Sequence, residues 1–303
     1  MSIHRKKLNE CIVRPINIPK IQRDDIQGGD VFDELYNNVL IMAKKKSGKS
    51  IVVRYILDNT INRNSSVIIF CPTFHKDDVW ISIAKMLEKK KIVYQVFSSV
   101  KEDGVNVLDE LISEFEKPED PTGRMQDKEE QVKKSEQEIL MFGDDEVKER
   151  KPRKPRKKAP QRVLIFDDIA NELKSVSNIV KKNRHLFCRI IISTQNLMFS
   201  DIFRQMDQIL IFKGLQHTDK LRQIYDNTDL CVSYETFLRL YNEATKNPWS
   251  FLYVDVRNNL FRENFNTLLD VNDRERVEQE EPEVENGVPL VPHPFQRILR
   301  RLK

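Results

Sequence analysis

Short apolar, β-branched runs alternate along the chain with longer segments in which apolar residues recur every three or four positions. The short runs are expected to be strands and lie at residues 39–42, 66–70, 93–97, 162–168, 189–194 and 208–212. The longer segments are expected to be helices and lie at residues 50–61, 77–89, 105–115, 171–182, 219–225 and 234–244. This alternation predicts an α/β fold whose mainly parallel sheet is flanked by helices. Residues 250–255 and 260–263 are expected to add an edge hairpin.

The pattern stops between residues 117 and 161, where Glu, Lys, Pro and Asp dominate and apolar periodicity is lost. Such a segment cannot bury enough apolar surface to offset its ordering entropy, so a disordered charged insert is expected. The core is expected at residues 39–116 and 162–263, with an N-terminal extension at 1–38 and a tail at 264–303. That tail is acidic and then basic, and its amphipathic end predicts a helix that forms on a partner.

Composition narrows the class of protein only modestly. The 303 residues include 51 Lys and Arg against 47 Asp and Glu, and 39% are hydrophobic, enough for one sizeable core. No apolar run approaches the roughly 20 residues of a membrane span, and the start lacks the features of a secretory signal. Cys11, Cys71, Cys188 and Cys231 are far apart, which favours free thiols in a reducing, cytoplasm-like compartment.

Residues 43–50 carry the strongest motif and connect an expected strand to an expected helix. Such a loop wraps phosphates with backbone N–H groups, reaches them with a lysine and binds Mg²⁺ through a hydroxyl. Two positions depart from the usual pattern, because Ala43 replaces the first Gly and Lys46 stands where many such loops carry another. The candidate ATP-binding residues are Ala43, Lys44, Lys45, Lys46, Ser47, Gly48, Lys49 and Ser50.

A second motif, Asp167-Asp168, ends the apolar run at residues 163–166. The carboxyl ends of parallel strands hold the ligands of open α/β sheets, so these carboxylates are candidates for catalysis. Asp167, with Ser50, is expected to hold Mg²⁺, and Asp168 to polarise the attacking water. Gln195, at the end of the next buried run, is a candidate for orienting that water. The alternative is that the two aspartates only cap the following helix.

Taken in order, these motifs resemble the FtsK/HerA superfamily of DNA-translocating ATPases, and within it the poxvirus-type genome-packaging ATPases of large DNA viruses, virophages and polinton-like elements. The residues that carry the resemblance are 47–50, 70–73 with Trp80, 164–168, Arg184-His185, 192–195 and Arg204.

The resemblance implies a RecA-like (ASCE) P-loop NTPase core that forms a ring of five or six copies. It also implies ATP and Mg²⁺ as cofactors, and double-stranded DNA and a capsid or portal-vertex protein as partners. Arg184, or else Arg204, is the implied arginine that reaches the nucleotide of a neighbouring subunit. The expected location is the host cytoplasm or a viral factory, with the nucleus and the virion as further expected sites.

Three functions stay open: a genome-packaging ATPase, another translocase or helicase of the same superfamily, and a scaffold protein that kept the fold but lost the nucleotide. Intact Lys49, Ser50, Asp167 and Gln195 argue against the scaffold. The absence of an N-K-x-D motif disfavours a GTPase. The basic run at residues 148–158 is a candidate DNA contact, or else a solvated insert or a nuclear localisation signal.

Overall fold

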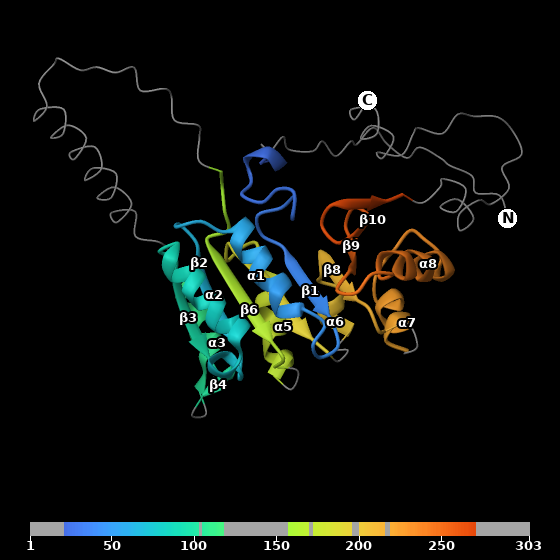
Figure 1. Ribbon diagram of the computed structural model, residues 1–303. Helices are drawn as coiled ribbons and strands as arrows, with labels where there is room; N and C mark the ends of the chain where they lie inside the picture. Colours follow the sequence, from blue (N-terminus) through green and yellow to red (C-terminus); the bar gives the residue numbers. More distant parts are fainter. Residues whose placement is uncertain are drawn as a thin grey trace, which may run out of the picture. The chain divides into compact units, whose positions relative to one another are not determined.

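The structure is a computed structural model that describes residues 21–102, 105–117, 157–169, 172–195, 200–215 and 219–270 (Figure 1). The chain divides into two compact units. Unit 1 comprises Met1–Asn37 and Ser50–Ile191, and unit 2 comprises Asn38–Lys49 and Ile192–Lys303. Most of the predicted charged insert, most of the basic run at residues 148–158, the basic C-terminal end and Cys11 lie outside the described residues.

Unit 1 contains parallel strands, and their side chains are mostly buried in all of them except β3. They are β2 (Ser66–Phe70), β3 (Val93–Phe97), β6 (Arg162–Asp167) and the first part of β7 (Cys188–Thr194), in the order β3-β2-β6-β7. In the register, Ser66 is opposite both Val93 and Arg162. Strand β6 is buried at five of its six residues, as expected inside a parallel sheet, whereas Val93 of β3 is 70% exposed. The carboxyl end of β6, at Asp167, is therefore buried inside unit 1.

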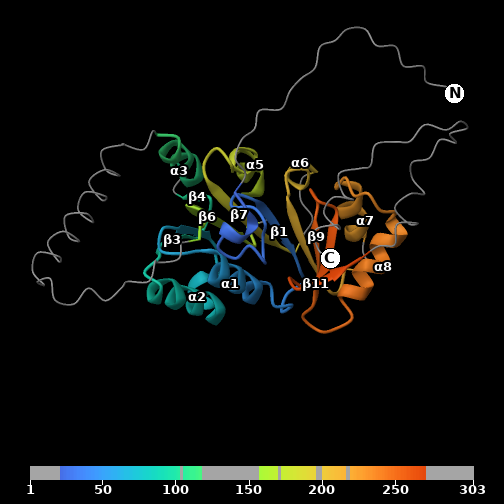
Figure 2. The ribbon, with the colours of Figure 1, turned by 90° about the horizontal axis from the view of Figure 1, so that it is seen from above.

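Helices cover both faces of these strands. They are α1 (Lys49–Thr60), α2 (Asp78–Lys89), α3 (Val107–Phe115) and α5 (Leu173–Lys182). Figure 2 shows α1 and α2 on one face and α3 and α5 on the other. Helix α2 begins where the Asp77 side chain accepts a hydrogen bond from the Val79 N–H, 2.8 Å away. Its buried residues Trp80, Ile83 and Leu87 follow helical spacing, so the indole of Trp80 faces the strands.

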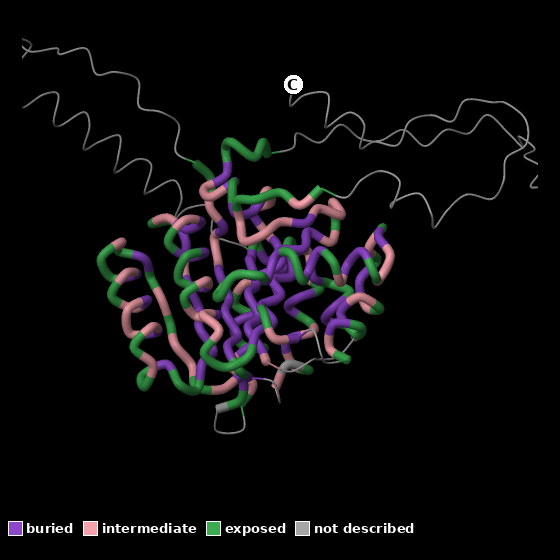
Figure 3. The backbone as a smooth tube through the Cα atoms, turned by 45° about the vertical axis from the view of Figure 1, so that its right-hand side comes forward, coloured by how far each residue is buried: buried purple, intermediate pink, exposed green. Residues whose placement is uncertain are grey.

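Unit 2 combines parallel and antiparallel strands. They are β1 (Asn38–Met42), β8 (Gln208–Phe212), β9 (Phe251–Asp255), β10 (Leu260–Glu263) and β11 (Thr267–Leu269), with the end of β7 beside β1. Strands β1 and β8 are parallel and place Met42 opposite Ile211, whereas β9, β10 and β11 follow as antiparallel neighbours. Buried residues gather in the strands, and β1, β8 and β9 are buried throughout (Figure 3).

The helices of unit 2 are α6 (Ser200–Phe203), α7 (Asp219–Asp226) and α8 (Tyr234–Ala244). Helix α8 contacts α7, β9 and β10. Its Tyr241 is fully buried, and the hydroxyl donates to the Phe212 carbonyl (3.0 Å) and accepts from the Leu215 N–H (3.0 Å). These bonds anchor the chain where it leaves β8. None of the described helices is long and apolar enough to cross a membrane.

The predicted fold class is confirmed, because nine mostly parallel strands are flanked by helices. Three local predictions were wrong. The helix expected over residues 105–115 starts only at Val107, because residues 105–106 form β5 (Val105–Asn106), paired with β4 (Lys101–Glu102). The strand expected to end at Asp168 ends at Asp167, since Asp168 has a φ of 53°. The hairpin is not the edge, because β11 pairs beyond it.

Two segments assigned from the sequence to the extension and the insert contact the core of unit 1. Phe32 is 1% exposed, and the buried Arg189 lies over its ring, 4.8 Å from the centroid. The Arg189 guanidinium donates to Asn37 Oδ1 (2.5 Å) and to the Glu34 carbonyl (2.8 Å). Residue Lys158 forms an isolated parallel bridge with Ile26. The ordered core therefore begins before residue 39 and resumes before residue 162.

Candidate functional site

The predicted phosphate loop, residues 43–48, leaves the carboxyl end of β1 in unit 2. Ala43 is fully buried, and its N–H donates to the carbonyl of Thr194 on β7, 3.2 Å away. Ala43 is not among the residues with positive φ. The position that carries Gly in the usual pattern therefore needs no glycine here, because a methyl group packs in the core and the backbone is unstrained.

The loop turns through two left-handed positions, Lys46 with a φ of 61° and Gly48 with a φ of 89°. The Ser47 hydroxyl donates to the Lys44 carbonyl, 2.6 Å away, and this hydrogen bond stabilises the turn. The backbone N–H groups of residues 44–48 have no hydrogen-bond acceptor among the described residues. Successive N–H groups in such a turn form a concave anion site, so the loop fits a polyphosphate.

Positive charge surrounds this turn. Lys44, Lys45 and Lys46 are exposed, whereas Lys49, the first residue of α1, is only 8% exposed. The first turn of α1 contains no acidic residue, so no side chain there offsets the positive end of the helix dipole. The half-buried Ser50 follows as the second helical residue. Its hydroxyl, like the carboxylate of Asp167, is a hard oxygen donor of the kind that Mg²⁺ prefers.

Asp167 and Asp168 end β6 in unit 1 and differ in their surroundings. Asp167 is 4% exposed, and its Oδ2 accepts hydrogen bonds from Trp80 Nε1 at 3.1 Å and from Cys71 Sγ at 3.7 Å. Asp168 is exposed and left-handed, with a φ of 53°. The first carboxylate is therefore held by buried donors, whereas the second projects from a turn at the strand end.

Cys71 stays protonated beside Asp167. Burial raises the pKa of the Cys71 thiol to about 11; the hydrogen bond from Thr73 opposes this and the charge of Asp167 adds to it. The thiol is therefore an S–H donor to the carboxylate and not a thiolate at neutral pH.

The contact of Trp80 and Cys71 with Asp167 was not predicted from the sequence. The available signal was a tryptophan on the buried face of α2, since a buried indole N–H usually has a hydrogen-bond partner.

Gln195 lies next to the start of the phosphate loop in unit 2. It follows Thr194, whose carbonyl accepts from the Ala43 N–H. The Gln195 carbonyl accepts from Lys220 Nζ, 2.8 Å away, which ties the strand end to α7. The structure therefore places Gln195 beside the start of the loop, and its role toward a bound ligand stays a prediction.

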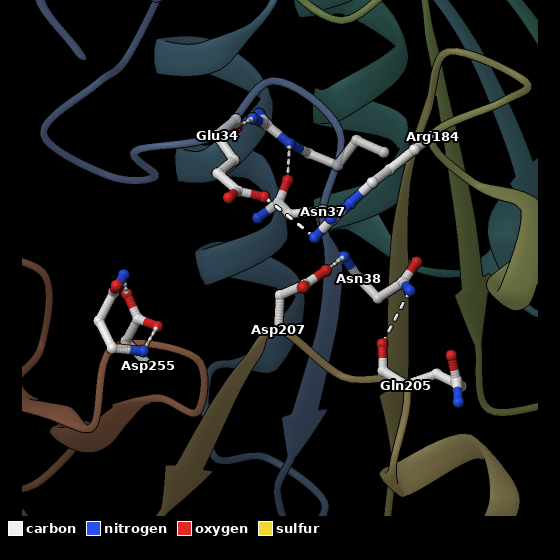
Figure 4. A network of polar contacts seen from close by, with 9 residues as sticks. Glu34, Asn37, Asn38, Arg184, Gln205, Asp207 and Asp255 are labelled. Atoms are coloured by element: carbon white, nitrogen blue, oxygen red, sulfur yellow. Dashed lines mark hydrogen bonds and ion pairs between the residues drawn. The ribbon is translucent and has the colours of Figure 1, made fainter. Parts of the chain in front are cut away.

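Arg184 and Arg204 lie at the opposite, amino-terminal ends of strands. In unit 1, Arg184 Nη2 forms an ion pair with Glu34 Oε2, 3.2 Å away (Figure 4), and precedes β7. In unit 2, the exposed Arg204 precedes β8. The carbonyl of the next residue, Gln205, accepts a hydrogen bond from Asn38 Nδ2, 2.8 Å away (Figure 4). Within its own unit, Arg184 is a strand length from Asp167, roughly 17–20 Å, and Arg204 is as far from the loop.

A scan of the sequence against models of known protein families gives no match, and a search of curated proteins gives none either. Among solved structures, the chain is similar to the genome packaging NTPase B204 from Sulfolobus turreted icosahedral virus 2. The complex with AMP has 16% sequence identity and a TM-score of 0.44, over 76% of this chain and 97% of that chain. The complex with AMPPCP has 17% identity and a TM-score of 0.42, over 76% and 97%.

Proposed function

We propose that the protein is an ATPase that moves double-stranded DNA and packages a viral genome. The observation that supports ATPase activity is the phosphate loop. It connects a fully buried strand, through two left-handed residues, to a helix that begins with Lys49. That arrangement suits a nucleoside triphosphate. The order of the motifs along the chain supports the step from ATPase to DNA packaging.

Each candidate residue has a distinct role in this proposal. Lys49 neutralises phosphate charge, and Ser50 and Asp167 hold Mg²⁺. When bound, Mg²⁺ would neutralise charge that develops on the phosphoryl oxygens. Asp168 positions the attacking water and accepts its proton, and the Gln195 amide orients that water. Trp80 and Cys71 keep the Asp167 carboxylate fixed.

The proposal includes an assembly of several copies, and the positions of the two arginines support it. Both precede strands, at the amino-terminal ends opposite to the motif in their own unit, and Arg184 is paired with Glu34. An arginine that serves catalysis would then come from a neighbouring copy, in a ring of five or six. The proposed partners are double-stranded DNA and a capsid or portal-vertex protein, in the host cytoplasm or a viral factory.

The test is ATP hydrolysis over a series of protein concentrations, with and without long double-stranded DNA. The native chain is compared with Lys49→Ala and Asp168→Asn. We expect turnover per chain to rise with protein concentration and with DNA, and both substitutions to abolish it. Hydrolysis that is independent of concentration and DNA would contradict the translocase. A chain that neither hydrolyses nor binds ATP would favour the scaffold alternative, in which the Ala43 and Lys46 departures reflect a lost site.

A further inference from the structure

Trp249 is a large aromatic side chain that unit 2 leaves in solvent. It lies between α8 and β9, and 67% of its surface is exposed. Its backbone is left-handed, with a φ of 69°, which is uncommon for a bulky residue. Burial in the core therefore does not explain why a tryptophan occupies this position, and the left-handed backbone does not favour a large side chain there.

The strand register places Trp249 at the end of the sheet where the phosphate loop starts. Strands β1 and β8 are parallel, so Met42 and Phe212 end at the same edge. Strand β9 is antiparallel to β8 and pairs Phe251 with Phe212, so its amino end reaches that edge too. Trp249, two residues before β9, thus lies beside the loop.

The contact with the loop is direct. A Cβ built on Gly48 would lie 3.5 Å from Cε3 of Trp249, at van der Waals distance. The six-membered ring therefore lies against the glycine that precedes Lys49. All of these residues belong to unit 2.

We propose that Trp249 is the stacking surface for the base of the bound nucleoside triphosphate. This proposal rests on the proposed function of the loop as a phosphate site. With the phosphates held by the loop and the N-terminus of α1, the base extends one sugar away, and an exposed indole next to Gly48 offers it an aromatic face. Stacking uses the π-face that every base has, so the surface binds adenine and guanine alike and does not select between them.

The test compares ligands with and without a base. Binding of ATP, GTP and inorganic tripolyphosphate, each with Mg²⁺, is measured by calorimetry on the full chain. The variants are Trp249→Ala, Trp249→Phe and Leu268→Ala, a control that shortens another exposed apolar side chain of unit 2. We expect Trp249→Ala to weaken ATP and GTP binding by about 5- to 150-fold and to leave tripolyphosphate unchanged. Trp249→Phe is expected to keep most of the affinity, and Leu268→Ala all of it.

Fluorescence gives a second readout, because the chain has two tryptophans and Trp80 is fully buried. ATP without Mg²⁺, which leaves Asp167 beside Trp80 without a metal, should change the emission of the native chain, and this change should be lost in Trp249→Phe. Equal weakening of ATP and tripolyphosphate in Trp249→Ala would overturn the stacking role, as would no weakening at all. If the native chain binds tripolyphosphate and ATP equally, the proposal that Trp249 stacks on the base is wrong, but the phosphate site is not contradicted. If the native chain binds neither ligand, both the stacking role of Trp249 and the proposed ATPase activity are wrong.

Discussion

The phosphate loop of unit 2 and the carboxylate pair of unit 1 are fixed by different means. The loop depends on its backbone, with left-handed residues at Lys46 and Gly48 and lysine side chains in solvent. Asp167 depends on side chains, since the buried Trp80 and Cys71 donate to one of its oxygens. The difference shows that one motif is sensitive to conformation and the other to the loss of a single donor.

The same difference predicts how each region responds to substitution. Side chains at the exposed loop positions tolerate change as long as the backbone can turn, whereas a change that keeps the shape around Asp167 but removes an N–H should still affect catalysis. Lys49, which follows the loop as the first residue of α1, is the exception, because it is buried whereas Lys44, Lys45 and Lys46 are exposed.

The largest effect is expected for Lys49→Ala. Removing a preorganised positive charge from a phosphate site typically costs about 10²- to 10³-fold in kcat. We expect a loss of that size in ATP turnover, measured at a fixed protein concentration with DNA. The matched control is Lys246→Ala, an exposed lysine of unit 2 paired with Glu243, which should keep native turnover. Equal losses in the two variants would mean that overall charge, and not the position of Lys49, matters.

The second effect concerns the donor to Asp167. Trp80→Phe keeps an aromatic ring in the core but removes the N–H that contacts Oδ2. We expect kcat to fall about 10-fold, because the carboxylate loses its orientation, and the free energy of unfolding to fall by about 2 kcal/mol. The affinity for ATP measured without Mg²⁺ should stay unchanged, since the loop is intact.

Ile83→Val is the control, because Ile83 lies on the same buried face of α2 and makes no polar contact through its side chain. It should lower the free energy of unfolding by about 1 kcal/mol and leave kcat unchanged. If Ile83→Val lowers kcat as much as Trp80→Phe does, packing of α2 and not the N–H supports the carboxylate.

Much of the fold follows from the sequence because local pattern and burial agree there. Strand β2, strand β3 and strand β8 have the predicted bounds, since each is a short apolar run between polar turns. The start of α2 follows from the Asp77 cap. The positive φ at Lys46 matches the expectation that glycine is usual at that position.

Long-range contacts are what the pattern could not supply. The bond between Trp80 and Asp167 joins residues 87 positions apart, and Trp249 lies beside Gly48 only because β9 pairs with β8. Periodicity reports which side of a helix is buried and not which polar atom lies opposite. The short pairing of β4 with β5 was missed because two-residue strands have no period to detect.

The third prediction uses the pKa of the thiol beside Asp167. The pKa of Cys71 is raised by burial from 9.0 to about 11, so between these values the folded state keeps a proton that the unfolded state has lost. The unfolded state then binds fewer protons, and stability must fall as pH rises from 9 to 11, by at most about 1.4 kcal/mol per pH unit for this group. Cys71→Ala should make the fall shallower in urea unfolding followed by circular dichroism.

Cys188 offers the comparison variant, since burial raises its pKa to about 12 and its thiol donates to the Leu186 carbonyl instead of to a carboxylate. Cys188→Ala should also reduce the slope, with the effect extending to higher pH, but should leave ATP turnover at pH 7 unchanged. An unaltered slope in both variants would show that neither thiol is shielded as its burial requires.

The smallest effect is expected from glycine substitutions in the loop. Lys46 is strained at a φ of 61°, so Lys46→Gly should relieve strain and raise the free energy of unfolding by up to about 1 kcal/mol. Ala43 is buried without positive φ, so Ala43→Gly should lower it by about 1 kcal/mol, although it restores the usual motif. Thermal unfolding of both variants measures the signs. Changes of opposite sign would mean that the backbone conformation at each position, and not similarity to the usual motif, determines the stability of the loop. Changes of equal sign would refute this and remove the contrast with the carboxylate pair.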